Sequence, residues 1–450
     1  MVEPPLEPGL PRRPSFAASA AITYGSQIVA AVLSLANVLI VSRTLGPSGR
    51  GQIAFLTAIA FLSANLATLG VQEAMANIAG AEPERRRALA GNALVFSILF
   101  GAAAAGIVVL LVAVFPAIGG DADPHLRWLV LALIPFLILE IYLRFLVQAD
   151  YGFTVSNAAW LIPPVLNVLA NAAFALVGVL SVRTAVVTWL AGQVLASTLL
   201  AVYVLRRLAG FGRPDLALAR RSLAFGTKSH GGRIMLLGNY RLDQWILGAI
   251  SGDRELGLYS VAVAWAEALF YLPTALAAVQ RPDLVRASRE EAGRQGAFVF
   301  RTSALFTLVL AVGLVVAAPA LCVWTFGEEF RGSIDDLRVL AFGGVGIVAL
   351  KLLGSALTAQ ARPLLATAAI GVGFLSTVTL DALLIPGHGG LGAALASSIS
   401  YSLGGIAVAL IFCRTLRTPL TELVPRGTEP LQLWRYLRRR DRPVAGAERT

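Results

Sequence analysis

The residues of this sequence that could do chemistry are ionisable side chains inside long apolar stretches. Three stretches carry them: ILEIYLRF, FGTKSHGGRIMLLGNYRLDQWILG and VAVAWAEALFYLP. An ionised group near the centre of a bilayer costs about 2.5–3.5 kcal/mol on insertion scales, so such a group is expected to face a cavity or a partner. The members of this set are Glu140, Arg144, Arg233, Arg241, Asp243 and Glu267, and Lys228 and His230 lie closer to the cytoplasmic interface.

Residues 225–248, read as a helix, show two polar stripes. One stripe, in a sector of about 80°, contains His230, Arg233, Arg241 and Gln244, and the other contains Lys228, Asn239 and Asp243. Arginine binds phosphate through paired donors. We therefore predict that Arg144, Arg233 and Arg241 bind an anionic cargo in a positively charged interior, and a pyrophosphate group would fit.

The carboxylates of the same stretches are candidates for a coupling proton or sodium ion. We consider Glu267 and Asp243 first and Glu140 beside them. Two structural alternatives stay open. Glu140 has the spacing to neutralise Arg144 within one helix, and Glu267 could pair with an arginine of residues 225–248. Asp381 is expected near the outer interface, with little role.

Three asparagines add polarity to otherwise apolar stretches. Asn167 and Asn171 share one helical face after Pro163 and Pro164, and Asn37 lies in the first apolar stretch. We predict all three asparagines as substrate contacts. Hydrogen bonding between helices is the alternative for such amides.

The elements that position these residues are transmembrane helices. The chain is 57% apolar and 14% charged, and a bilayer core of roughly 30 Å takes about 20 apolar helical residues. Unbroken apolar runs exclude barrel strands, which alternate. We predict an all-α polytopic membrane protein with twelve spans, at residues 17–42, 51–72, 91–115, 128–148, 157–180, 185–205, 226–250, 257–280, 298–320, 337–358, 363–385 and 390–413.

Arginine placement predicts the orientation. Most arginines fall in the tails and in alternate loops, which the positive-inside rule places in the cytoplasm. Both termini are then cytoplasmic, and the arginine- and alanine-rich composition suggests a bacterial cytoplasmic membrane. The net charge of +11 flanks the spans, so it does not indicate a nucleic-acid partner. Cys322 and Cys413 form no cluster, and no metal, cofactor or catalytic residue is predicted.

The chain divides into two similar halves. GPSGRGQIAFLTAIA (Gly46 to Ala60) aligns with GDRELGLYSVAVAWA (Gly252 to Ala266), and FLVQADYGFTVSNAAW aligns with ALTAQARPLLATAAIG. Six spans in each half give both halves the same orientation, with a substrate site between them. The predicted organisation is a tail (1–16), a first lobe (17–208), a linker (209–225), a second lobe (226–413) and a basic tail (414–450).

The sequence resembles the oligosaccharide and polysaccharide flippases of the multidrug/oligosaccharidyl-lipid/polysaccharide exporter superfamily. The resemblance is carried by SQIVAAVLSLANVLIVSRTLGPSGRGQIAF, NYRLDQWILGAISGDRELGLYSVAVAWAE, the QADYG turn and GHGGLGAALASSIS. It implies two lobes around a positively charged cavity. It also implies transport of polyprenyl-pyrophosphate-linked glycans by alternating access, often coupled to a proton or sodium gradient.

The expected function is therefore a lipid-linked oligosaccharide flippase for cell-surface polysaccharide synthesis, working among membrane lipids. One alternative is a drug or lipid exporter of the same superfamily, which a basic cavity disfavours. Another is a membrane enzyme acting on lipid-linked sugars, because Asp121-Ala-Asp123 spells a metal-binding pattern of some transferases. That loop is short, and a solvated acidic turn explains it.

Overall fold

The structure is a computed structural model, and it describes residues 16–116, 123–207, 210–270 and 287–427 with a few positions between 271 and 286. In these residues the regular elements are helices. The helices are α1 (Phe16–Ala67), α2 (Val71–Ala81), α3 (Arg86–Val114), α4 (Pro124–Ala132), α5 (Ile134–Ala149), α6 (Phe153–Val177), α7 (Val182–Arg207), α8 (Leu216–Ala266), α10 (Arg289–Pro319), α11 (Ser333–Ala359) and α12 (Pro363–Leu416). Short helical turns η1, η3, η4 and η5 join or extend them.

The three longest helices are each broken at one glycine. Gly46 in α1, Gly252 in α8 and Gly389 in α12 have φ values of 65°, 83° and 53°. Residues with a Cβ rarely adopt such values, so glycine permits the chain to reverse there. Each break separates two of the predicted spans. In the described residues eight helices are long and apolar enough to cross a membrane. Two of these, α1 and α12, are broken and hold two predicted spans each, and two further predicted spans fall at the broken helix α8, which is too polar to be among the eight.

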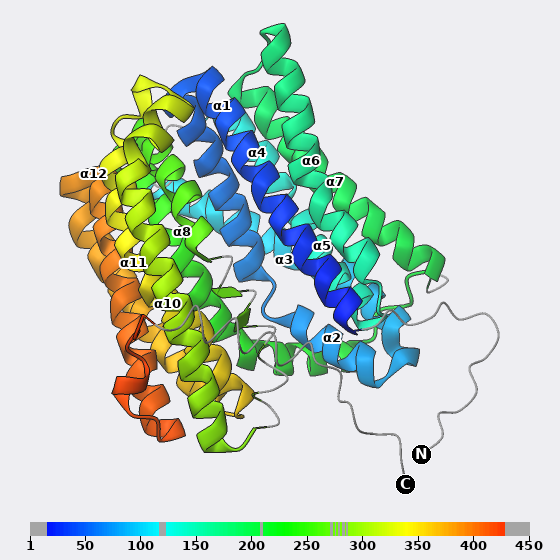
Figure 1. Ribbon diagram of the computed structural model, residues 1–450. Helices are drawn as coiled ribbons and strands as arrows, with labels where there is room; N and C mark the ends of the chain where they lie inside the picture. The colour runs from blue at the N-terminus through cyan, green and yellow to red at the C-terminus, as the bar shows by residue number, and fades with distance from the viewer. Residues whose placement is uncertain are drawn as a thin grey trace.

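Figure 1 shows two groups of helices, with α3–α7 on one side and α10–α12 on the other, and α1 and α8 between them. α1 packs extensively against α8. The predicted repeat agrees with the backbone at one aligned position, because Gly46 and Gly252 have similar backbone angles, φ 65°, ψ −174° and φ 83°, ψ 175°.

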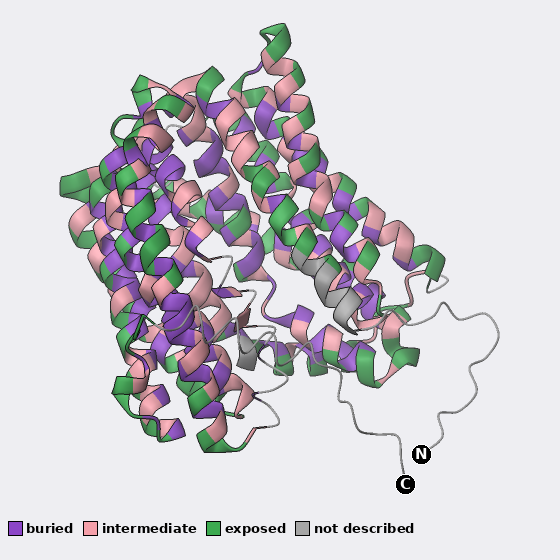
Figure 2. Cartoon of the chain, in the orientation of Figure 1, coloured by how far each residue is buried: buried purple, intermediate pink, exposed green. Residues whose placement is uncertain are grey.

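Apolar residues fill the interior of each group and also cover its outside. One buried core includes Phe55 and Tyr142 of the first half, and a second includes Phe412 of α12. Large apolar side chains such as Val309 and Val316 are exposed on the outer face of α10 (Figure 2). Exposure of this kind fits a surface that is covered by lipid.

The breaks define two ends of the molecule. A Cβ on Gly46 would touch Glu329, and one on Gly389 would touch Glu255, so the breaks lie at one end, which we call the kink end. After each break the chain returns through the bundle, and the first return leads to α2. We call that opposite end the α2 end.

The structure differs from the sequence-based expectation in several boundaries. The helix α2 was not expected, and α8 begins at Leu216, so much of the predicted linker 209–225 is helical. The helix α12 continues to Leu416, and Glu422 then pairs with Arg301 at 2.8 Å. Residues 1–15 and 428–450 of the predicted tails, and Asp121, lie outside the described residues.

Candidate functional site

The candidate site is a cavity between the two halves, made of two chambers. The α2-side chamber has a volume of about 380 Å³ and the kink-side chamber about 300 Å³. Ser34, Phe61, Trp189 and Gln193 line both chambers, so the chambers meet at these residues. The walls come from α1, α5, α6 and α7 of the first half and from α8 of the second.

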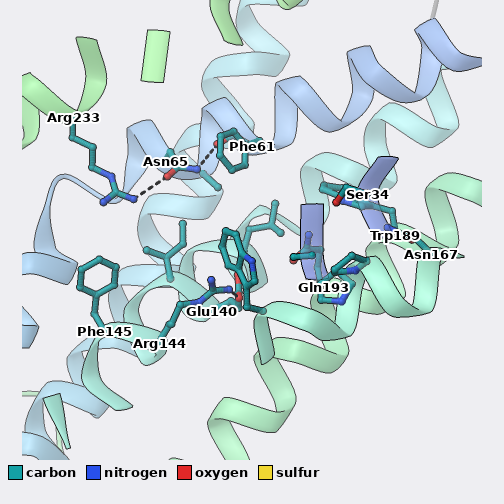
Figure 3. Close-up of a pocket in the computed structure, with 17 residues that line it drawn as sticks. Ser34, Phe61, Asn65, Glu140, Arg144, Phe145, Asn167, Trp189, Gln193 and Arg233 are labelled. Carbon is teal, nitrogen blue, oxygen red and sulfur yellow. Dashed lines mark hydrogen bonds and ion pairs between the residues drawn. The ribbon is translucent and has the colours of Figure 1, made fainter. Parts of the chain in front are cut away.

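Arg144 lines the α2-side chamber beside Glu140 and Trp160 (Figure 3). Arg144 and Glu140 form an ion pair within α5, which is one of the two roles considered for Glu140. The guanidinium carbon of Arg144 lies 4.3 Å from the centroid of the Trp160 ring. The side chains of Arg144 and Glu140 are only 14% and 8% exposed. Asn167 lines the same chamber and is also buried.

Arg233 enters the α2-side chamber from α8. Its guanidinium lies 3.1 Å from a carboxylate oxygen of Glu73 in α2. It also donates to the side-chain oxygen of Asn65 at 3.3 Å (Figure 3). Glu73 and Asn65 belong to the first half and Arg233 to the second. These contacts therefore tie the halves together next to the cavity.

Arg241 lines the kink-side chamber and pairs with Glu267. The Nη1 atom of Arg241 lies 2.7 Å from the Oε1 atom of Glu267, and each side chain is 30% exposed. This pairing is the structural alternative that we left open for Glu267. Arg50 lines the same chamber from α1, so guanidinium groups from both halves face one space.

Asn37 and Asn171 lie against each other rather than along either chamber. The side-chain nitrogen of Asn171 donates to the side-chain oxygen of Asn37 at 2.8 Å, which joins α6 to α1. Interhelical hydrogen bonding, the alternative considered for these amides, is the contact that they make. Of the three asparagines, the structure places only Asn167 on the chamber wall.

Asp243 lies on the other face of α8, inside the second half. It accepts hydrogen bonds from the hydroxyls of Tyr259 at 2.5 Å and Ser397 at 3.2 Å. Asp381 of α12 lies within electrostatic range of Asp243 and is fully buried. Neither carboxylate oxygen of Asp381 has a hydrogen-bond partner among the described residues. Carboxylate and hydroxyl oxygens are the ligand type that hard cations prefer, so these two carboxylates and the hydroxyls beside Asp243 are candidates for binding such a cation.

Direct backbone contact closes the cavity at its kink end. A Cβ on Gly51 would overlap the carbonyl oxygen of Asp253, and a Cβ on Gly257 would overlap the carbonyl oxygen of Pro47. Each contact joins α1 to α8. We call these contacts the kink-end seal.

A second set of contacts closes the α2 end. Gly70 and Gly226 approach so closely that a Cβ on either would overlap the other's backbone. The imidazole of His230 hydrogen-bonds the carbonyl oxygen of Leu66 at 2.9 Å, and the pair of Arg233 and Glu73 lies beside them. We call these contacts the α2-end seal. With both seals formed, the two halves contact each other at both ends of the cavity.

Three residues of the site were not expected from the sequence. Arg50 fell between the predicted spans 17–42 and 51–72. Glu73 fell between predicted spans, and only a tertiary contact connects it with Arg233. The signal for Asp381 was its position in the middle of an apolar run, the same signal that we followed for Glu267. In the described part of the chain, no group of three or more His, Cys, Asp or Glu side chains could hold a metal ion.

Comparisons with known proteins agree with this architecture. The chain matches the family model described as "Polysaccharide biosynthesis protein" over residues 40–335, more than half of its length. No protein of curated function matches the sequence. The fold is similar to that of the lipid II flippase MurJ in an inward closed conformation, with a TM-score of 0.76 and 13% identity over 94% of this chain and 93% of that one.

Two further solved structures share the fold. A multidrug resistance MATE family transporter of the MOP superfamily, inward-facing, has a TM-score of 0.70 and 14% identity over 88% of this chain and 98% of that one. A MOP superfamily transporter from Pyrococcus furiosus, described as having a binding pocket of reverse polarity, has a TM-score of 0.61 and 15% identity over 90% of this chain and 95% of that one.

Proposed function

Because the chain belongs to the polysaccharide biosynthesis protein family of membrane transporters, we propose that it is a flippase for a polyprenyl-pyrophosphate-linked glycan. It moves this lipid between the leaflets of the bacterial cytoplasmic membrane for cell-surface polysaccharide synthesis. The observation that carries the proposal is the charge of the cavity. Its lining contains four arginines, Arg50, Arg144, Arg233 and Arg241, and two glutamates, Glu140 and Glu267.

The arginines supply the chemistry that a diphosphate requires. A guanidinium donates two parallel hydrogen bonds to phosphate oxygens, and such charge-assisted bonds are about twice as strong as neutral ones. Three of the four arginines are paired with carboxylates in this structure, namely Arg144 with Glu140, Arg233 with Glu73 and Arg241 with Glu267. In the empty site these carboxylates neutralise the three arginines, and a diphosphate would compete with the carboxylates for them.

Alternating access follows from the two seals. The α2-end seal includes the pair of Arg233 and Glu73, and Arg233 also lines the cavity. A diphosphate that binds Arg233 would therefore weaken that seal. We place the α2 end in the cytoplasm and both termini with it, because Arg85, Arg86 and Arg207 lie at the helix ends there. The kink end then faces the opposite side of the membrane.

Coupling to a proton or sodium gradient is proposed to occur at Asp243 and Asp381. Asp243 lies on one face of α8, and Arg233 and Arg241 lie on its cavity face. A cation bound between the two carboxylates would change how α8 packs against α12, and the same helix carries two of the cargo-binding arginines. A ligand shifts a conformational equilibrium by its difference in affinity between the states, and α8 provides that link. Glu267 and Glu140 act instead as counter-ions of arginines in this proposal.

The alternative functions have less support. A cavity with more arginines than carboxylates disfavours a carrier of cationic drugs. For an enzyme of lipid-linked sugars, the proposed metal pattern began at Asp121. Its second aspartate, Asp123, accepts a hydrogen bond from the backbone nitrogen of His125 and caps α4, which is a structural role.

Reconstitution in liposomes tests the function. A fluorescent polyprenyl-pyrophosphate sugar is added to one leaflet, and its appearance in the other is followed with a membrane-impermeant quencher, with and without a sodium or proton gradient. We expect flipping by the wild type, a loss of at least tenfold in Arg144→Gln, and normal flipping in Arg183→Gln, whose side chain is exposed at the start of α7. If the wild type does not flip the lipid, the proposed function is wrong.

A further inference from the structure

Arg50 differs from the other arginines of the cavity because it has no ion-pair partner in the part of the chain that the structure describes. Arg144, Arg233 and Arg241 each form an ion pair with a carboxylate. Among the described residues no ion pair or hydrogen bond is made by Arg50, and its Nε atom is buried. A charged group that is removed from water without a partner is costly. An anion that binds beside the guanidinium of Arg50 would neutralise this charge, so the empty site favours anion binding.

The position of Arg50 defines where that anion would lie. Arg50 lines the kink-side chamber together with Arg241 and Glu267. Arg241 and Glu267 lie within electrostatic range of the Arg50 guanidinium. Thr57, Gln244 and Ser260 also line this chamber, so neutral hydrogen-bonding groups surround the charges. Two guanidiniums against one carboxylate leave a net positive site between α1 and α8.

Arg50 also lies next to the kink-end seal. The following residue, Gly51, is in direct contact with the backbone of Asp253. Arg50 belongs to the first half and Arg241 to the second, so opening that seal moves the two guanidiniums apart. An anion that contacts both would hold the halves together at the kink end.

We propose that Arg50 and Arg241 form a bridging subsite for the diphosphate of the cargo, occupied immediately before release at the kink end. This inference rests on the proposed function. A diphosphate diester carries two negative charges, one on each phosphoryl group, and two guanidiniums on facing walls match that pattern. Binding of the diphosphate to both arginines favours the closed kink-end seal. When α1 separates from α8, the diphosphate loses contact with one of the two arginines and the cargo can leave.

The experiment measures binding and closure separately from flipping. The probe is geranylgeranyl pyrophosphate, and its affinity for the purified full-length protein is measured by thermophoresis. We expect Arg50→Gln to weaken binding of the probe about tenfold. Arg50→Lys should keep most of the affinity because the positive charge remains. Arg50→Glu should bind more weakly than Arg50→Gln because the new carboxylate can pair with Arg241. The matched control is Arg254→Gln, an exposed arginine of α8 just beyond the corresponding break at Gly252.

Closure is read from spin labels on opposite halves. Labels at Arg183→Cys and Arg331→Cys, both exposed near the kink end, are placed in a chain whose Cys322 and Cys413 are replaced by serine. The probe should shorten the interlabel distance when Arg50 is present and leave it unchanged with Arg50→Gln. A variant that is misfolded is recognised because its unliganded distance distribution differs from that of the parent.

Each outcome decides between the two proposals. If the wild type flips the lipid-linked sugar and Arg50→Gln binds and closes like wild type, the bridging subsite is wrong and the proposed function stands. If the wild type does not flip the sugar, but binds the probe and closes through Arg50, then the subsite stands and the cargo is a different diphosphate. If the probe does not bind the wild type, the subsite is wrong.

Discussion

The pair of Arg241 and Glu267 allows a prediction whose sign is unusual, because removing a charge from the site should improve binding. In the proposed mechanism Glu267 competes with the diphosphate for Arg241. The substitution Glu267→Gln keeps the size of the side chain and removes that competition. We therefore expect a lower Kd for a polyprenyl pyrophosphate.

The magnitude follows from the distance and exposure of the pair. Unit charges about 4 Å apart at an effective dielectric of 20 attract by about 4 kcal/mol, whereas exposed pairs measured in proteins contribute about 0.2–1 kcal/mol. The two groups are 2.7 Å apart and each side chain is 30% exposed, which places the competition between these limits, at about 1–2 kcal/mol. Since about 1.4 kcal/mol corresponds to a tenfold change in Kd, the affinity should rise roughly 5- to 30-fold.

The assay is equilibrium binding of geranylgeranyl pyrophosphate to the purified protein, with flipping measured in parallel. Glu328→Gln is the matched control, because Glu328 pairs with Arg331 at the same 2.7 Å but both side chains are about 70% exposed and lie outside the cavity. Its Kd should equal that of the wild type. Weaker or unchanged binding in Glu267→Gln would refute the competition between Glu267 and the diphosphate. Flipping should slow, because a tighter complex releases its cargo less readily.

Three further predictions follow from the same structure. Asp381→Asn should abolish the dependence of flipping on a sodium or proton gradient and leave the Kd of the diphosphate probe unchanged. The control is Asp335→Asn, which changes an exposed carboxylate of α11 and should behave like wild type. If flipping by Asp381→Asn still depends on the gradient, Asp381 is excluded as a coupling site. Gly257→Val should prevent closure of the kink-end seal, because the valine side chain would overlap the Pro47 carbonyl. The distance between spin labels on the two halves should lengthen, and flipping should fall at least tenfold. An unchanged distance between the labels would contradict the close contact of Gly257 with Pro47. The pKa of Glu422 is lowered, first because Arg426 donates a hydrogen bond to it and also because Arg301 of α10 does. The pair of Arg301 and Glu422 attaches residues 417–427 to α10, so this attachment is present above the ordinary pKa of glutamate and is lost as the pH falls through the lowered value. Hydrogen exchange in residues 417–427 should accelerate only under strongly acidic conditions, and acceleration already near neutral pH would count against the pair of Arg301 and Glu422.

Much of this fold could be predicted from the sequence, because the signal for a membrane helix is local. The apolar runs, the break at Gly46 and its counterpart at Gly252 all depend on neighbours along the chain. Arg144 and Arg241 were expected in the interior for the same reason, since their flanking residues are apolar. Both line the cavity.

The rest depends on contacts between distant segments. Nothing near Arg233 in the sequence indicates that Glu73 is its partner, because the two are joined only when α2 packs against α8. Arg50 follows a turn and has the sequence pattern of a solvated loop arginine, and only the folded chain shows that it lines a chamber. The role of Asp381 depends in the same way on its distance from Asp243.

The pairing of cavity arginines with carboxylates has a consequence for the electrical behaviour of the carrier. Four lining arginines and the three glutamates bound to them leave about one net positive charge in the described part of the unloaded cavity. A transmembrane potential acts on a moving charge with about 2.3 kcal/mol per elementary charge per 100 mV, so four unpaired arginines would make the return of the empty protein strongly dependent on voltage. With most of that charge cancelled locally, the empty protein can reorient in an energised membrane against only a small electrical force.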